Sequence, residues 1–324
     1  MNILVTGGCG FIGSHFVKYW LSKWHSDNVI VLDKLTYAGK TDNLKACRTV
    51  YDKSLRIVIG DICDKQLVRE LFEEYDFDYV VNFAAETHVD NSINSASEFI
   101  QTNIVGTSVL LDVAKESWKG KSTKRFLQVG TDEVYGALSR LCEPFTEESE
   151  IEPSSPYSAS KASADLLALA YHKTFGLPVV ITRCSNNYGS YQDYEKLIPR
   201  MIKKALNDER LPIFGDGQQV RDWLYVGDHC TAIHEVLRYG RLGEVYNVGG
   251  NNELTNIEIV NIILSELDKP TSLIEFVPDR LGHDFRYAID ATKLETELGW
   301  KPARDFKTNI IKTIKWYRMH KDYK

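Results

Sequence analysis

Cysteines are few in this sequence, and their positions do not suggest a cross-linked or metal-binding protein. The 324 residues include six cysteines, with no Cys-x-x-Cys pair and no spacing typical of metal ligands. A disulfide framework is therefore not expected, and reduced thiols in a cytoplasm fit better. The sequence predicts no metal site.

Long apolar runs and an excess of positive charge are also absent. No stretch approaches the roughly 20 apolar residues that cross a bilayer, and the N-terminus lacks the parts of a signal peptide. The net charge is −6, whereas nucleic-acid binders usually carry a basic patch. We therefore expect a soluble cytoplasmic protein that begins at residue 1 and has no membrane or nucleic-acid partner.

Short apolar runs alternate with helical patterns in the first part of the chain. Most of the runs are apolar on both faces, which is typical of a parallel sheet covered by helices on both sides. Strands are predicted at 3–6, 29–32, 56–59, 79–83, 125–129 and 179–182, and helices at 11–24, 65–75, 98–116 and 157–175. The predicted fold class is α/β, with a Rossmann-type doubly wound parallel sheet.

The alternation loosens after about residue 188. Helical patterns return at 195–206, 256–267 and 305–320, and two short segments, 223–226 and 245–248, read as strands that return to the first domain. We expect an NAD-binding domain at 1–188, with return segments near 222–248. A smaller α/β domain at 189–324 would bind the substrate.

A glycine-rich turn follows the first predicted strand and opens the first predicted helix. In GGCGFIG at 7–13, Gly7 permits the tight turn, Gly10 lets the backbone approach a pyrophosphate, and Gly13 allows close packing of helix on strand. Free N–H groups at the helix start favour phosphate. A glycine trio alone is equally typical of a structural turn, but the order of strand, glycines, helix and second strand favours a dinucleotide site.

An acid, Asp33, ends the second predicted strand, 20 residues after Gly13. It can accept hydrogen bonds from the adenosine ribose and would repel a 2′-phosphate, which favours NAD over NADP. Lys34 beside it weakens that repulsion. Asp61 and Ile62, after the third strand, have the position expected of adenine neighbours.

Tyr157 and Lys161 are four residues apart, so on a helix they lie one turn apart on one face. An ammonium beside a phenol stabilises the phenolate and lowers the phenol pKa from about 10, which gives a general base. Most tyrosine–lysine pairs at this spacing lie on the solvated surface of a helix. Pro156 supports a helix start directly before Tyr157, which would fix the geometry of this pair.

Thr131, Asp132 and Glu133 directly follow the predicted strand at 125–129. Ligands of open α/β sheets bind at the carboxyl ends of strands, so these side chains fall where a substrate would lie. A solvated acidic loop is the ordinary alternative. Their place after a buried strand favours a catalytic role.

Over nearly its whole length the chain resembles the dTDP-glucose 4,6-dehydratases, within the extended short-chain dehydrogenases. Segments that carry the resemblance include TGGCGFIGS, DKLTYAG, NFAAETHVDNSI, GTDEVYG, SPYSASKASAD, TRCSNNYG and FGDGQQVRDWLYVGDH. The specific part is TDEVYG with YSASK, since related epimerases lack the adjacent aspartate and glutamate. The resemblance implies conversion of dTDP-glucose to dTDP-4-keto-6-deoxyglucose plus water, with NAD that stays bound.

The resemblance also assigns the roles of the catalytic residues. Tyr157 takes the proton of the sugar 4-hydroxyl while NAD accepts the C4 hydride, and Lys161 tunes Tyr157 and holds the nicotinamide ribose. Thr131 helps to hold the sugar near O4. Glu133 removes the C5 proton, Asp132 protonates the departing 6-hydroxyl, and the hydride returns to C6. Like-charge repulsion and burial can keep one carboxyl charged and its neighbour protonated.

Two further sets of residues follow from the same resemblance. The implied cofactor residues are Gly7, Gly10, Phe11, Ile12, Gly13, Asp33, Lys34, Leu35, Thr36, Asp61, Ile62, Phe83, Ala84, Ala85, Thr102, Asn103, Tyr157, Lys161 and Asn187. The implied substrate residues are Thr87, His88, Thr131, Asn186, Lys196, Leu197, Pro212, Phe214, Arg221, Asn256, Arg280 and His283. Lys196, Arg221 and Arg280 would neutralise the diphosphate.

The sequence departs from the family's usual pattern at several places. Asn91 stands where arginine is frequent, GSYQDY at 189–194 replaces a GPYQFP-like stretch, and Leu281 and Phe285 replace a proline and an arginine. These changes leave the identity of the base or sugar open. The same chemistry on UDP-glucose, a nucleotide-sugar 4-epimerase or decarboxylase, and a non-catalytic NAD-sensing protein remain alternatives.

A homodimer is expected, as in similar proteins. The helices at 98–116 and 157–175 would form a four-helix contact between subunits. Ile100, Ile104, Leu167 and Tyr171 are candidate contact residues, although packing within one chain explains them equally well.

Overall fold

A seven-stranded sheet forms the centre of the computed structural model, which describes residues 1–121, 123–279, 284–303 and 305–323. The strand order is β10-β6-β5-β4-β1-β2-β3, and every neighbouring pair is parallel. The strands are β1 (Asn2–Thr6), β2 (Asn28–Asp33), β3 (Leu55–Ile59), β4 (Tyr79–Asn82), β5 (Arg125–Thr131), β6 (Val179–Cys184) and β10 (Val245–Val248).

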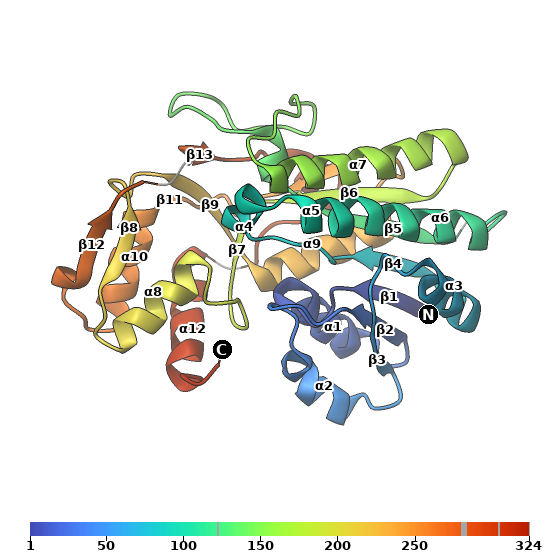
Figure 1. The fold of residues 1–324 in the computed structure, drawn as a ribbon, viewed down its shortest axis with the longest axis horizontal. Coiled ribbons are helices and arrows are strands. Elements are labelled where there is room, and N and C mark those ends of the chain that lie inside the picture. Colours follow the sequence, from blue (N-terminus) through green and yellow to red (C-terminus); the bar gives the residue numbers. More distant parts are fainter. Residues whose placement is uncertain (122, 280–283, 304, 324) are drawn as a thin grey trace.

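Helices cover both faces of this sheet (Figure 1). Ile3 and Val5 of β1 pack on one face with α1 (Phe11–Lys23) and α9 (Val226–Tyr239), whereas Leu4 between them packs on the other. That second face carries α3 (Lys65–Tyr75), α6 (Thr107–Ser117) and α7 (Pro156–Phe175). The alternation of buried residues along β1 confirms the predicted doubly wound fold.

The helix expected at 98–116 forms, but its hydrogen-bonding pattern changes along its length. A short α5 (Ser97–Phe99) leads into a π-helical segment, η2 (Ile100–Gly106), and then into α6. Such π segments often occur at functional sites, because they turn side chains that an α-helix would aim elsewhere. Here Asn103 lies within η2 and is buried.

The later part of the chain forms smaller layers around a separate core. One sheet contains β11 (Glu253–Thr255), β9 (Val220–Tyr225) and β13 (Arg286–Tyr287), with β7 (Asn186–Tyr188) also paired to β9. A second sheet pairs β8 (Leu211–Phe214) with β12 (Ile274–Val277). The core around them is filled by α8 (Leu197–Leu206), α10 (Asn256–Glu266) and α12 (Phe306–Met319). Shorter elements are η1 (Thr41–Leu44), α2 (Lys45–Val50), α4 (Val89–Asn94), η3 (Asp132–Tyr135), η4 (Thr271–Leu273) and α11 (Thr292–Leu298).

Of the two segments expected to return to the first domain, one does so as a strand. Residues 245–248 form β10 and pair with β6 in the large sheet, which confirms the prediction. The segment 223–226 does not return as a strand: residues 223–225 end β9, which pairs with β11, β13 and β7, and Val226 begins α9. The chain returns to the large sheet through α9, which packs on one face of it and was not predicted from the sequence. An apolar pattern marks a strand but does not specify the sheet that receives it.

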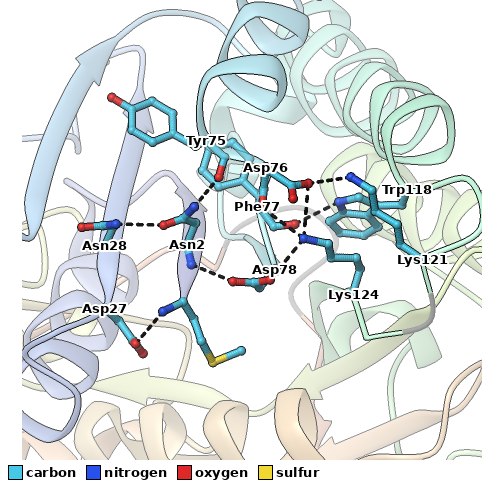
Figure 2. A network of polar contacts seen from close by, with 11 residues as sticks. Asn2, Asp27, Asn28, Tyr75, Asp76, Phe77, Asp78, Trp118, Lys121 and Lys124 are labelled. Atoms are coloured by element: carbon cyan, nitrogen blue, oxygen red, sulfur yellow. Dashed lines mark hydrogen bonds and ion pairs between the residues drawn. The ribbon is translucent and has the colours of Figure 1, made fainter.

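The amino ends of three adjacent strands are joined by a polar network (Figure 2). The Asn2 backbone N–H donates to the Asp78 carboxylate at 2.9 Å, and Lys124 Nζ donates to the same carboxylate at 3.1 Å. Lys124 is buried and also contacts Asp76. These residues precede or begin β1, β4 and β5, so the network holds the amino ends of these strands together. The carboxyl ends of the strands take no part in it and are open to a ligand.

Two further expectations concern cysteines and membranes. All six cysteines are free in this structure. Within the described residues, no helix combines the length and apolar character needed to span a bilayer.

Candidate active site at the carboxyl edge of the sheet

The turn between β1 and α1 leaves no room for side chains at two positions. Gly7 has φ +65°, and a Cβ there would lie 2.8 Å from the Ala84 nitrogen. A Cβ on Gly13 would lie 2.4 Å from the Gly7 carbonyl oxygen. Gly10 precedes α1 and provides no side-chain cap, so the N–H groups of the first helical turn face outward for an anion. The turn therefore fits a dinucleotide pyrophosphate.

Asp33 both braces this turn and faces the adjoining cavity. Its buried carboxylate accepts hydrogen bonds from the backbone N–H groups of Cys9 and Leu35, each at 2.8 Å. Burial raises the pKa of Asp33, and the two backbone hydrogen bonds oppose that shift. Each carboxylate oxygen can accept a second hydrogen bond, which leaves capacity for ribose hydroxyls. Lys34 pairs with Asp61 at 2.8 Å, so its charge is matched by a different acid.

Thr131, Asp132 and Glu133 lie where β5 ends, as expected. Thr131 caps η3: its hydroxyl accepts from the Glu133 N–H and donates to Asp132 Oδ1, both at 3.4 Å. Asp132 is 2% exposed, and its Oδ2 has no hydrogen-bond partner.

The surroundings of Asp132 favour its protonated form. Burial raises the pKa of Asp132 well above its ordinary value, and the nearby charges of Glu133 and Asp222 add to the rise. Arg221 and the Thr131 hydrogen bond oppose it. A raised pKa favours a neutral carboxyl at Asp132 next to Glu133, in line with the roles that the resemblance implies for the two acids.

Tyr157 and Lys161 lie one turn apart at the start of α7. Pro156 is the first helical residue, and Ser155 caps the helix, which confirms the expected helix start. Lys161 is buried, and its ammonium donates to the Val129 carbonyl at 2.6 Å.

The expected lowering of the Tyr157 pKa is not seen in this structure. Burial raises the pKa of Tyr157 well above its ordinary value, and the charge of Glu133 raises it further. A hydrogen bond between Thr131 and Tyr157 acts in the opposite direction. The Lys161 ammonium is directed at a carbonyl, and burial lowers its own pKa. The expectation that the Lys161 ammonium lowers the Tyr157 pKa is therefore corrected, because both groups are buried and burial raises the pKa of the phenol.

Two adjoining cavities run along this edge. The glycine-loop cavity, of about 310 Å³, extends from the glycine turn and Asp33 to Tyr157 and Lys161. The α8 cavity, of about 400 Å³, extends to Pro212 on β8. Both are lined by Val89, Glu133, Asn186, Asn187, Gln192, Glu195 and Lys196. A ligand at Glu133 can therefore contact groups bound in either cavity.

The predicted site residues converge on these cavities. All of the expected cofactor residues line the glycine-loop cavity except Leu35 and Asn103. Every expected substrate residue in the described part of the chain lines one of the two cavities, whereas Arg280 and His283 lie outside the described residues.

Leu35 and Asn103 do not line the glycine-loop cavity themselves, but they form hydrogen bonds with residues that do. Leu35 donates its backbone N–H to Asp33. Asn103 exchanges hydrogen bonds with the backbone of Glu86 at 2.9 and 3.1 Å and donates to Ser160 Oγ at 2.8 Å. The π-helical segment thus fixes Glu86, which itself lines the glycine-loop cavity.

The two expected diphosphate cations in the described part of the chain, Lys196 and Arg221, already have protein partners. Lys196 donates to the Thr87 carbonyl at 3.1 Å and pairs with Glu195 at 3.3 Å. Arg221 donates to the Asp284 carbonyl at 2.9 Å and lies over the Tyr287 ring at 4.4 Å. These contacts hold both side chains at the α8 cavity.

Several wall residues were missed from the sequence. Cys184 ends β6 of the large sheet, so the rule about carboxyl ends applied to it as well. Gln192, Glu195 and Tyr287 carry no such signal. They are placed by loops and by the small sheet, which local sequence does not specify.

Comparisons with known proteins agree with this geometry. A family model described as GDP-mannose 4,6 dehydratase matches residues 4–313. A Sinorhizobium fredii protein described as a probable dTDP-glucose 4,6-dehydratase is 51% identical over 329 residues, which cover 98% of this chain and 93% of the relative. The dTDP-glucose 4,6-dehydratase of Haemophilus influenzae is 51% identical over 338 residues, which cover 98% of both chains.

A solved structure extends the likeness to three dimensions. DesIV, a dTDP-glucose 4,6-dehydratase from Streptomyces venezuelae with NAD and TYD bound, matches with a TM-score of 0.94 and 47% identity, covering 100% of this chain and 98% of that chain. The resemblance and the Rossmann fold expected from the sequence are thereby confirmed. The chain belongs to the dTDP-glucose 4,6-dehydratases, within the group that the GDP-mannose 4,6 dehydratase model describes.

Proposed function

We propose that this chain is an NAD-dependent hydro-lyase that converts dTDP-glucose to dTDP-4-keto-6-deoxyglucose and water. The observation that carries the proposal is the buried carboxyl of Asp132 beside Glu133, which lines both cavities, with Tyr157 on the wall of the glycine-loop cavity. A protonated acid beside a base suits the elimination of water. A 4-epimerase has no leaving hydroxyl to protonate, so this pair favours a dehydratase.

The glycine-loop cavity would hold NAD, with the pyrophosphate at the glycine turn and the adenosine ribose at Asp33. Bound NAD supplies hydride exchange with C4 and C6 of the sugar. Lys161 and Asn187 line the opposite end of this cavity, near Tyr157. The α8 cavity would hold the nucleotide part of the substrate.

The chain's own residues manage the protons. The phenolate form of Tyr157 accepts the proton of the 4-hydroxyl, and together with loss of the C4 hydride to the cofactor this leaves a ketone that acidifies C5–H. Glu133 takes the C5 proton, and Asp132 gives its proton to the departing 6-hydroxyl, which leaves as water. Glu133 then returns its proton to C5. Tyr157 then holds the proton of the 4-hydroxyl, while Asp132 lacks the proton that left with the water. One proton must therefore pass from Tyr157 to Asp132 to close the cycle, and the Thr131 hydroxyl, which donates to Asp132 Oδ1, would relay it.

This assignment also suggests the limits of the two domains and the compartment of the protein. Residues 1–188, with the return segments near 222–248, would form the NAD-binding domain, and residues 189–324 the nucleotide-sugar domain. Free cysteines suit a reducing compartment, so we assign the protein to the cytoplasm.

Paired incubations with dTDP-glucose and UDP-glucose, followed by mass spectrometry, test the function. We expect dTDP-glucose to lose one water and to be consumed faster than UDP-glucose. An isomer of unchanged mass would indicate an epimerase, and an unaltered sugar would indicate a protein that only binds. Equal consumption of both sugars would overturn the assignment of thymine nucleotides.

The Asp33→Ala variant is expected to bind NAD roughly 10- to 150-fold more weakly, the usual worth of hydrogen bonds to a charged group, and to admit NADP more readily. Calorimetric titration of both cofactors checks this. Asp33 also braces Cys9, so the unfolding temperature must be measured alongside. Equal use of NAD and NADP by the unmutated protein would contradict the role given to Asp33.

A homodimer is the expected assembly. The η2–α6 helix lies beside α7 on one face of the protein (Figure 1). Ile100 on η2 is 49% exposed and Leu166 on α7 is 54% exposed, whereas Leu167 and Tyr171 pack against the chain's own core and Ile104 is half-buried. The exposed apolar side chains of this face would be covered by a second copy.

Light scattering is expected to give the mass of two chains for the unmutated protein and of one chain for the double variant Ile100→Glu, Leu166→Glu. Leu141→Glu is the matched control, because Leu141 is 96% exposed on the loop between η3 and α7 and belongs to neither helix. A concentration-independent monomer before mutation would contradict the dimer.

A further inference from the structure

Two segments of the chain face each other at the glycine-loop cavity. The post-β2 segment (residues 36–43) contributes Thr36, Ala38 and Gly39 to its wall. The pre-α8 segment (residues 189–196) contributes Asp193 and Glu195 among others, and it also lines the α8 cavity. No strand joins them, so their relative position depends on side chains.

An ion pair connects the two segments. Lys40 Nζ lies 3.3 Å from Asp193 Oδ2, and each side chain is 26% exposed. The other carboxylate oxygen of Asp193 accepts the Glu195 backbone N–H at 3.1 Å, and its carbonyl accepts the Lys196 N–H at 3.1 Å. Asp193 therefore organises the turn that carries Glu195 and Lys196, and Lys40 holds that turn from the post-β2 side.

Tyr323 supports the ion pair from outside the cavity. The Lys40 ammonium lies 4.7 Å from the centre of the Tyr323 ring, a cation–π contact. The Tyr323 hydroxyl lies 3.1 Å from Asn43 Oδ1 and 2.8 Å from the Tyr191 carbonyl oxygen. One side chain thus contacts both segments.

The post-β2 segment is in turn tied to the glycine turn. The Lys40 backbone N–H and the Asn43 side-chain amide both donate to the Cys9 carbonyl, at 3.1 and 2.9 Å. A continuous series of contacts therefore runs from the phosphate-binding turn through Lys40 and Tyr323 to the pre-α8 segment. The acid in this series, Asp193, belongs to the 189–194 stretch in which the sequence departs from the related pattern.

We propose that Lys40, Asp193 and Tyr323 form a bridge across the glycine-loop cavity that keeps the dinucleotide bound between turnovers. They are positioning residues that act through the two segments. The inference rests on the proposed function, in which the cofactor ends each cycle in its starting state and release serves no purpose. A dinucleotide extending from the glycine turn to Tyr157 would lie along the wall that the bridge holds closed.

Release of labelled NAD tests the bridge without any catalytic readout. The protein is loaded with radiolabelled NAD and chased with an excess of unlabelled NAD, and the retained label is followed over time. In Lys40→Met and Asp193→Asn we expect release about two- to fivefold faster, the range for a partly exposed ion pair. Tyr323→Phe, which keeps the ring and loses the hydroxyl, should also release faster.

Three comparisons separate a bridge from a general loosening. The double variant Lys40→Met, Asp193→Asn should release NAD no faster than the faster of the two single variants, because both changes remove the same ion pair. Added salt should speed release from the unmutated protein and have little effect on Lys40→Met, because salt screens a pair that the variant lacks. Lys45→Met, an exposed lysine on α2 just beyond the post-β2 segment, should release NAD at the unmutated rate. Turnover at saturating NAD should change less than the release rate.

Release from Lys40→Met at the unmutated rate would overturn the bridge, and so would a double variant in which the effects of the two single changes multiply. Both outcomes would leave the proposed function intact, since labelled NAD would still have bound. Failure of the unmutated protein to bind labelled NAD would instead overturn the cofactor assignment itself.

Discussion

The Tyr157→Phe variant is expected to lose turnover by about 10²–10⁴-fold, the usual worth of general acid–base help, and to lose C5 hydrogen exchange as well. Both follow from one step, because without a group to accept the 4-hydroxyl proton no ketone forms, and without a ketone C5–H is not acidic. The hydroxyl is buried and hydrogen-bonded to Thr131, so phenylalanine removes the proton acceptor while keeping the ring in place.

Turnover by product mass and C5 exchange by proton NMR in deuterated solvent measure the two effects. Tyr239→Phe is the matched control, because Tyr239 is 59% exposed at the end of α9, away from the site. C5 exchange at the normal rate in Tyr157→Phe would show that another group accepts the 4-hydroxyl proton.

The second large effect separates the two adjacent carboxyls. Glu133→Gln is expected to permit oxidation at C4 and to lose most C5 exchange, since the amide cannot take the C5 proton. Elimination should then stall before water leaves. Glu133 lines both cavities, which puts its side chain at the point where the sugar must lie.

Asp132→Asn should behave differently, because Asp132 acts later. Oxidation at C4 and C5 exchange should persist while water loss slows by about 10²–10⁴-fold. The order of the effects matters more than their size, since groups acting as a unit are not additive. Normal C5 exchange in Glu133→Gln, or normal turnover in Asp132→Asn, would mean that the roles are wrongly assigned.

The architecture of the first half was accessible from the sequence because its signals are local. Val29, Val31 and their neighbours form apolar runs of strand length, and the glycine turn and Asp33 follow two of those runs at a spacing fixed by the βαβ unit. Thr131 and Glu133 were found by the same logic, since a polar group after a buried strand lies at the ligand edge.

What the sequence did not reveal depends on distant partners. Residues 223–225 look like any other strand, and only the pairing of β9 with β11, β13 and β7 places them outside the large sheet. Glu195 and Tyr287 reach the cavities from a loop and from a two-residue strand. The electrostatics of Tyr157 were misjudged for a similar reason, because the spacing to Lys161 is local, whereas burial and the nearby Glu133 carboxylate depend on the fold.

The destination of the hydrogen on C4 tests the central claim most directly. The protein is incubated with dTDP-glucose that carries deuterium at C4, and the product is examined by mass spectrometry and NMR. The account predicts a product that has lost water and carries the deuterium at C6. Deuterium found at C4 of a sugar of unchanged composition, or a dehydrated product without deuterium at C6, would contradict it.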